Sequence, residues 1–159
     1  MVGVSQKLVL LAYAALYYFM VAKKYPKASS PTNEPRSMEL QSKNEVMATC
    51  DASAVNCFLA WCCTPARAAQ TMDSTGTLGY WPAALLMAFL APCTLWYANS
   101  FTDMNVTLGG QRKGACMGCI CAICCSCCVV AQDAQSLDYA TKATTGCCGV
   151  TDSSGQPLE

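Results

Sequence analysis

The stretch LGYWPAALLMAFLAPCTLWYA, residues 78–98, decides the fold class of this 159-residue chain. It contains no charged side chain, and at roughly 1.5 Å per residue a helix of this length covers about 30 Å, the thickness of a bilayer's hydrocarbon core. Tyr80 and Trp81 lie near its start and Trp96 and Tyr97 near its end, as is typical of residues at the two membrane interfaces. The stretch therefore predicts a transmembrane helix.

Two prolines set the expected shape of this helix. Pro82 falls in the first turn, where a missing N–H is tolerated because that group has no partner within the helix. Pro92 lies well inside the stretch and removes a hydrogen bond from the helix interior. We therefore expect a kink at Pro92, or a division into two helices.

A second apolar run, LVLLAYAALYYFMVA at 8–22, is preceded by Lys7 and followed by Lys23 and Lys24. The run alone is short for a span, but residues 1–24 are long enough if Lys7 extends its amine to the interface. A cleaved signal peptide has an apolar run of similar length. The basic cluster after the run and the lack of an A-x-A site at its end favour a retained transmembrane anchor helix.

The rest of the chain divides by composition into three parts. Residues 25–48 are polar and rich in proline, with a short helix expected at 37–47. They predict a solvated connector, or alternatively a strap that lies against a partner. Residues 49–140 form a cysteine-rich membrane domain, and residues 141–159 form a small, polar tail.

Two apolar stretches of this domain are harder to place. Residues 52–66 are too short to span a bilayer, and Pro65 limits them further. Residues 114–131 are uncharged and just long enough to cross, but they fit a buried helical hairpin equally well. We expect a membrane-associated, partly inserted helical element there. The predicted fold is therefore all-α, with two transmembrane helices and one partly inserted cysteine-rich segment.

The orientation of the chain follows from its basic residues. The lysines within 23–27 follow the first span and favour the cytoplasm-equivalent side for the linker. If the second span crosses, Arg112 and Lys113 fall on the opposite side, against the same rule. The conflict disappears if the second span is re-entrant at Pro92 or if residues 114–131 cross back.

Composition excludes several classes of function. The ten basic and ten acidic residues balance, so the chain lacks the basic stripe of a nucleic-acid-binding protein. It also contains no histidine, which removes the commonest general base and metal ligand. We therefore predict a protein that is not an enzyme and has no cofactor, with zinc as the one metal to be considered.

Fourteen cysteines are the most unusual feature of the composition. C-x-x-C pairs among them supply half of a tetrahedral thiolate site each, so Cys116, Cys119, Cys125 and Cys128 are the candidate zinc ligands. Several other roles compete with zinc binding: small apolar packing residues, some of them paired in disulfides, S-acylated thiols at the membrane, and redox or metal-transport thiols.

The packing role has its own pattern. On one continuous helix, Cys121, Cys124, Cys125 and Cys128 fall at i, i+3, i+4 and i+7 and form a single apolar face. After these cysteines, residues 132–142 predict an amphipathic helix. Its two carboxylates, Asp133 and Asp138, are expected to lie on a solvated face.

The order of motifs from Cys50 to Leu137 resembles the placenta-specific-eight family, which includes plant cadmium-resistance and cell-number-regulator proteins. The first family block resembles Cys50-Asp51, Cys57 and Cys62-Cys63-Thr64-Pro65, the hydrophobic segment resembles residues 78–98, and the last block resembles Cys119 and residues 125–133. The chain departs from the family pattern at Ala66, Ala131 and Gln135. The resemblance implies a helical, membrane-bound, oligomeric and non-enzymatic protein, sometimes linked to divalent-metal or calcium movement.

Three functions follow as expectations. The first is a non-catalytic, membrane-embedded accessory subunit of a larger assembly, for example an energy-transducing complex, because both apolar cores lack the charges of an ion pathway and carry small residues for close helix packing. The second is an oligomeric divalent-metal or calcium transporter of the family type. The third is an acylated or redox-sensitive membrane scaffold. The expected partners are membrane lipid and other subunits or copies of the chain, in an integral, multi-pass arrangement.

Overall fold

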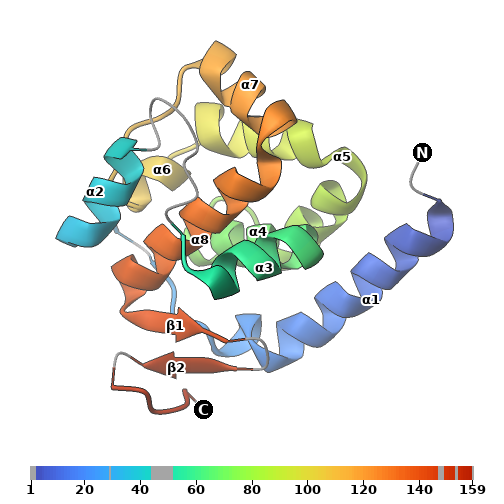
Figure 1. Ribbon diagram of the computed structural model, residues 1–159, viewed down its shortest axis with the longest axis horizontal. Coiled ribbons are helices and arrows are strands. Elements are labelled where there is room, and N and C mark those ends of the chain that lie inside the picture. The colour runs from blue at the N-terminus through green and yellow to red at the C-terminus, as the bar shows by residue number, and fades with distance from the viewer. Residues whose placement is uncertain (1–2, 29, 44–51, 147–148, 153, 159) are drawn as a thin grey trace.

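The computed structural model describes residues 3–28, 30–43, 52–146, 149–152 and 154–158, and it confirms the predicted helical fold (Figure 1). Two short strands form one antiparallel pair near the C-terminus. The elements in chain order are α1 (Val4–Met20), η1 (Ala22–Lys24), α2 (Pro35–Lys43), α3 (Ala54–Cys62), α4 (Thr64–Ser74), α5 (Tyr80–Phe101), α6 (Met104–Thr107), α7 (Ala115–Cys124), α8 (Ser126–Thr141), β1 (Ala143–Thr145) and β2 (Val150–Asp152).

Within the described residues, two helical segments are long and apolar enough to cross a membrane, Ser5–Lys24 and Tyr80–Phe101. They coincide with the two spans predicted from the sequence. Pro82 lies in the first turn of α5, as expected, because the missing N–H has no helical partner there.

The predicted disruption of α5 at Pro92 is confirmed. The backbone leaves helical geometry at Leu90, with φ −132° and ψ 39°, two residues before the proline. Proline has no N–H to donate to the carbonyl of Ala88, and its ring crowds that carbonyl. The Thr94 hydroxyl donates instead to the Leu90 carbonyl at 2.9 Å. As a result α5 folds back on itself and forms two arms.

Two further helix pairs break with nearly the same backbone angles. Cys63 separates α3 from α4 at φ −136° and ψ 37°, and Cys125 separates α7 from α8 at φ −136° and ψ 39°. Pro65 explains the first break, since it cannot continue the hydrogen bonds of α3. The second break has no proline, and α7 and α8 meet at 109°. The predicted partly inserted segment is thus a sharply bent helix pair.

The sequences around these two breaks repeat each other. Both fit C-x-x-A-x-C-C-[S/T]-x-x-x-x-A-Q, at residues 57–70 and 119–132. Burial repeats as well, because the alanine and glutamine positions are buried in both copies. Trp61 and Ile123 occupy the same position of the motif, and both are exposed. The chain therefore uses one helix–break–helix unit twice.

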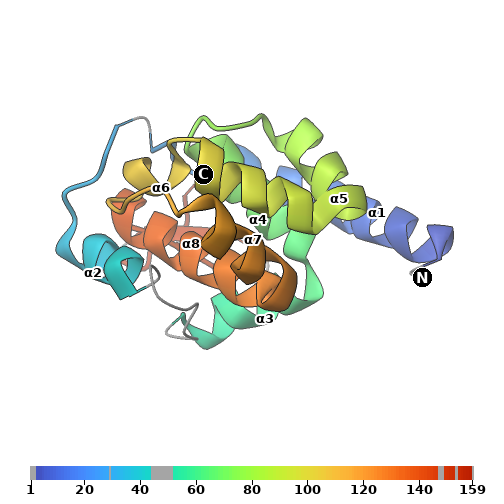
Figure 2. The same cartoon turned by 90° about the horizontal axis from the view of Figure 1, so that it is seen from above.

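The breaks within α3–α4, α5 and α7–α8 lie at one end of the molecule. Figures 1 and 2 show them in the right half, where the N-terminal half of α1 also extends, while α2 and α6 lie toward the left; Figure 1 shows the two strands at the lower left. Between these ends, α4 packs against α1, α3, α5 and α8. Its alanines, Ala66, Ala68 and Ala69, are buried and allow this close approach.

The linker and the tail differ from their predictions. Ser37, Leu40 and Gln41 of α2 are buried against α8, so this part of the linker belongs to the core rather than forming a solvated connector. The part of the expected helix beyond residue 43 lies outside the described residues. The tail contributes Ala143 and Val150 to the core through the β1–β2 pair, because alternate residues of a strand face the same side.

Candidate functional site

A buried ion pair lies at the centre of the helical core. Nη2 of Arg67, in α4, lies 2.9 Å from Oδ1 and 3.0 Å from Oδ2 of Asp138, in α8. Nε and Nη2 of Arg67 also donate to Oδ1 of Asn56 in α3, at 3.1 and 2.8 Å, and Nη1 donates to Oε1 of Gln70 at 2.6 Å. The guanidinium is fully buried, so these partners replace the water that it loses on folding.

The carboxylate of Asp138 gathers further donors. The Tyr25 hydroxyl donates to Oδ1 at 2.6 Å, the Thr145 hydroxyl to Oδ1 at 3.0 Å, and Asn56 Nδ2 to Oδ2 at 2.9 Å. These groups come from the start of the linker, from β1 and from α3. The network therefore connects elements from the whole length of the chain.

The network shifts the pKa values of two of its members, Arg67 and Tyr25. Burial by itself lowers the pKa of Arg67, but the Asp138 carboxylate and the neighbouring phenols raise it above its ordinary value. Burial, followed by the Asp138 charge, raises the pKa of the Tyr25 hydroxyl well above its ordinary value. Arg67 thus stays positive and Tyr25 stays a hydrogen-bond donor at any physiological pH.

A second polar cluster surrounds Asp133, one turn and a half before Asp138. Gln41 Nε2 donates to Asp133 Oδ1 at 3.4 Å and to the Ser136 hydroxyl at 3.0 Å. Lys113 is buried, and its backbone N–H donates to the Asn99 carbonyl at 3.1 Å. The prediction that Asp133 and Asp138 lie on a solvated face is wrong, since α8 is covered by α2, α3 and α4.

Lys113 and its sequence neighbour Arg112 differ in exposure. The Nζ of Lys113 is buried, whereas Arg112 is exposed and pairs with Asp103 at 2.6 Å. Both polar clusters join helices to one another through buried hydrogen bonds. Their arrangement is that of a structural core.

The four candidate zinc ligands are divided between two helices. Cys116 and Cys119 lie in α7, Cys125 is at the break, and Cys128 lies in α8 beyond the 109° bend. Among the residues that the structure describes, no group of three or more cysteine or acidic side chains could hold a metal ion. The break at Cys125 also divides the single helical face expected for the packing cysteines. Cys50, Cys147 and Cys148 lie outside the described residues.

Exposed apolar side chains define the most prominent surface of the molecule. Within the described part of the chain, Met38 is the only exposed large apolar residue outside α1, α3, α5 and α7. The side chains nearest the three breaks form what we call the apolar end: Phe58, Trp61, Phe89, Leu90, Ile120 and Ile123. A surface of this kind on a monomer marks a membrane or protein contact.

The apolar end is almost free of charge. The sequences of α3, α5 and α7 contain no Asp, Glu, Lys or Arg, and α1 contains only Lys7. The Lys7 ammonium lies 4.6 Å from the centre of the Phe89 ring, which provides a cation–π contact. Long basic side chains commonly cover apolar surface with their stems while the charge reaches toward water.

Backbone hydrogen bonds hold the two helices that flank α5 to one segment, residues 25–43, which we call the connector. Its Ala28 N–H donates at 2.8 Å to the carbonyl of Ser74, the last residue of α4. Its Thr32 N–H donates at 3.0 Å to the carbonyl of Thr107, the last residue of α6. The segments before and after α5 are therefore attached to the same part of the chain.

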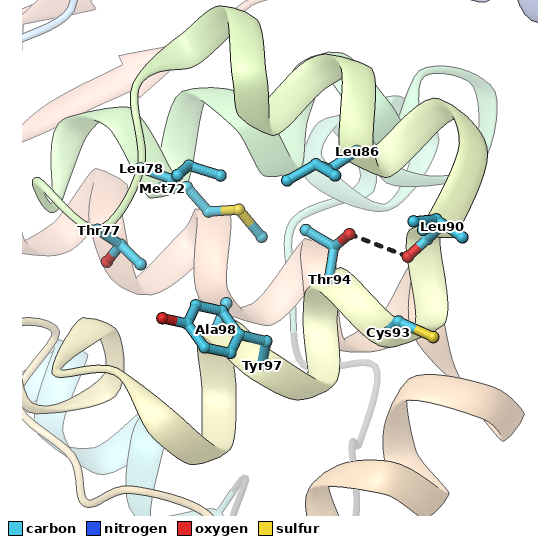
Figure 3. Close-up of a pocket in the computed structure, with 9 residues that line it drawn as sticks. All are labelled: Met72, Thr77, Leu78, Leu86, Leu90, Cys93, Thr94, Tyr97 and Ala98. Atoms are coloured by element: carbon cyan, nitrogen blue, oxygen red, sulfur yellow. Dashed lines mark hydrogen bonds between the residues drawn. The ribbon is translucent and has the colours of Figure 1, made fainter.

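A pocket of about 230 Å³ opens between the two arms of α5 (Figure 3). The end of α4 and the loop that follows close its remaining side. Almost all of its lining is apolar, and the lining residues are Met72, Thr77, Leu78, Leu86, Leu90, Cys93, Thr94, Tyr97 and Ala98. The pocket can hold an apolar group, but it presents no ionisable acid–base pair for catalysis.

The buried network was missed by the interpretation of the sequence. Arg67 lies in a short polar segment, TPARAAQ, whose helical pattern is interrupted by Pro65. The internal repeat was the available signal, because it aligns Gln70 with Gln132 and marks both as positions of one structural unit. Arginine and glutamine are mostly exposed in proteins, so residue type alone does not predict that Arg67 and Gln70 are buried.

Comparison with known proteins adds no assignment to these observations. No protein-family model, no curated protein and no solved structure matches the chain.

Proposed function

We propose that this protein is a non-catalytic, membrane-embedded accessory subunit of a larger membrane assembly. The observation that carries the proposal is the exposed apolar surface on α1, α3, α5 and α7, four helices whose single charged residue is Lys7. Soluble monomers rarely expose so many large apolar side chains together. The complete lack of histidine in the sequence supports the non-catalytic part of the proposal.

The contacts of the connector support one topology in particular. Because residues 25–43 bind the last residues of α4 and α6, the helices that flank α5, we place the start and the end of α5 on the same face of the bilayer. The α3–α4 and α7–α8 breaks enter from that face as well. Only Ser5–Lys24 then crosses, since 20 residues at roughly 1.5 Å each reach about 30 Å. The multi-pass arrangement predicted from the sequence is untested. We propose a single crossing instead.

The same topology removes the conflict between the basic residues. Lys23 and Lys24 are the last residues of the crossing segment, Lys27 follows it, and Arg112 follows a helix that returns to the same face. All four then lie on one side of the membrane, as the positive-inside rule requires. Membrane insertion of α5 as a folded-back pair of arms is acceptable where polar backbone groups are covered by protein.

A transporter of the placenta-specific-eight type is the competing function. It requires a polar or thiolate-lined path, whereas Arg67, Asp133 and Asp138 in the core hydrogen-bond to side chains of other helices. The resemblance to that family stays a prediction. Metal content per chain and oligomeric state separate the two functions, because only the transporter requires bound ions and a homo-oligomer.

The topology is tested by limited trypsin digestion of sealed vesicles prepared in both orientations. Lys27 and Arg112 are exposed trypsin sites. We expect both to be cleaved in one vesicle orientation and both to be protected in the other. Cleavage at one site and protection at the other would show that α5 crosses and would overturn the proposed topology.

The accessory role is tested by native purification in a mild detergent, followed by identification of the proteins that migrate with the chain. We expect a stable complex with other membrane proteins, from which a Trp61→Asp, Ile123→Asp double variant is lost. Purification solely as a homo-oligomer would contradict the accessory role.

A further inference from the structure

We propose that the pocket between the two arms of α5 binds one acyl chain of a membrane phospholipid. The inference rests on the proposed membrane insertion and assigns a specific ligand to one part of the inserted surface. Six of the nine residues that line the pocket belong to a candidate membrane span, and the other three come from the end of α4 and the loop that follows it. It therefore opens where hydrocarbon chains surround the protein.

The lining of the pocket fits hydrocarbon. Its exposed surface is almost wholly apolar, and the pocket contains no charged side chain. The Thr94 hydroxyl, the polar group nearest its middle, is already used by the hydrogen bond to the Leu90 carbonyl. Water in the pocket would find few partners, because an ordered water needs at least two polar groups.

The two ends of the pocket differ in chemistry. Figure 3 shows the hydroxyl groups of Thr77 and Tyr97 at one end, and Leu90 and Cys93 at the other. The Thr77 end lies beside the polar side of the molecule, where the exposed Lys27 pairs with Asp73. The Leu90 end is part of the apolar end. This order, from cation and hydroxyl to hydrocarbon, matches a phospholipid with its head group at Thr77 and its chain toward Leu90.

The dimensions favour a single chain over a protein segment. A helix with its side chains is about 10 Å across, too wide for a cavity of about 230 Å³ between two arms of one helix. An extended strand would bring unpaired backbone N–H and C=O groups into an apolar pocket that offers no partners, which is unfavourable. A flexible hydrocarbon chain has neither the width of a helix nor the polar backbone groups of a strand.

A photoreactive phospholipid with a diazirine within its acyl chain tests the inference, in vesicles that contain the full chain. Leu86→Trp fills the pocket at a position that is partly exposed, so the fold accommodates it. Leu85→Trp is the matched control, because Leu85 is the preceding residue, is exposed and does not line the pocket. We expect crosslinks in the wild-type chain to concentrate on the lining residues, and Leu86→Trp to reduce them severalfold while Leu85→Trp leaves them unchanged.

Resistance of each variant to carbonate extraction is measured in parallel. If the chain is carbonate-resistant but both variants crosslink like the wild type, the acyl-chain site is wrong while the membrane proposal stands. Crosslinks spread evenly over α1, α3, α5 and α7 would likewise overturn the site, because they indicate ordinary surrounding lipid. If the chain is released by carbonate, the proposed membrane function itself fails.

Discussion

Arg67 and Asp138 are joined by two contacts, of 2.9 and 3.0 Å, although they lie far apart in the sequence and both are buried. Their bond fixes α4 against α8, the second helices of the two repeated helix–break–helix units. The position of the α3 and α7 tips relative to each other therefore depends on this pair. A change in either charge is expected to loosen the whole apolar end.

Asp138→Asn keeps the shape of the side chain and removes its charge, which leaves the Arg67 guanidinium buried without a counter-ion. We expect the free energy of unfolding in detergent to fall by about 3 to 5 kcal/mol. The measurement is thermal or denaturant unfolding followed by circular dichroism. Asp103→Asn, in the exposed pair with Arg112, is the control and should cost about 1 kcal/mol or less. Equal losses for the two variants would show that the buried pair is not a special determinant of stability.

Gly118→Ala tests the close approach of α7 to α5. A Cβ atom at residue 118 would lie 2.1 Å from the Ser100 hydroxyl oxygen, so we expect a loss of roughly 1 to 3 kcal/mol. Adding Ser100→Ala should restore most of the stability, since the Ser100 Cβ lies at 3.5 Å, an ordinary contact distance. Gly114→Ala meets no atom within 4 Å and serves as the control. Failure of the second substitution to rescue the first would place the strain elsewhere.

Trp61→Asp and Ile123→Asp test the apolar end at equivalent positions of the internal repeat. Each places a carboxylate where the proposed topology has hydrocarbon, at a cost of roughly 2.5 to 3.5 kcal/mol near the bilayer centre. We expect weaker partition into phospholipid vesicles, with the melting temperature in detergent little changed because both side chains are exposed. Met38→Asp, on α2, should partition like the wild type. An equal loss for Met38→Asp would contradict the assignment of one membrane-facing end.

Metal removal tests the candidate zinc ligands directly. Because α7 and α8 separate Cys116 and Cys119 from Cys128, we expect a strong chelator to leave the melting temperature unchanged. Stoichiometric zinc in the purified chain, together with a fall in melting temperature on chelation that a Cys116→Ser variant abolishes, would establish the site that the spacing first suggested.

The sequence was informative where a single helix determines the result. The uncharged length of residues 78–98 was enough to predict a candidate span, and Pro92 was enough to predict its interruption, because both effects are local. The direction taken after the interruption was not predictable. It depends on Ala28 and Thr32, which bind backbone groups on either side of α5 from a distant part of the chain.

Residues of the core were predicted least well, for a related reason. Asp133 and Asp138 lie in a sequence pattern typical of an exposed helix face. Their hydrogen-bond partners, which are distant in the sequence, offset the cost of burying the two carboxylates. Cys125 looked like one member of a continuous helical face, yet the helix ends there without a proline or glycine to signal it. Such features follow from tertiary packing, which a local pattern does not contain.

The attachment of α4 and α6, which flank α5, to the connector has a consequence for how the protein is made. If every connecting segment between α1 and the two strands stays on one face, none of these charged segments has to be translocated through the lipid during synthesis. The helices can then insert from the ribosome's side of the membrane in the order in which they are synthesised. The packing of α2 into the core requires α8, because the Ser37 hydroxyl donates to the carbonyl of Ser136, a residue that is synthesised much later.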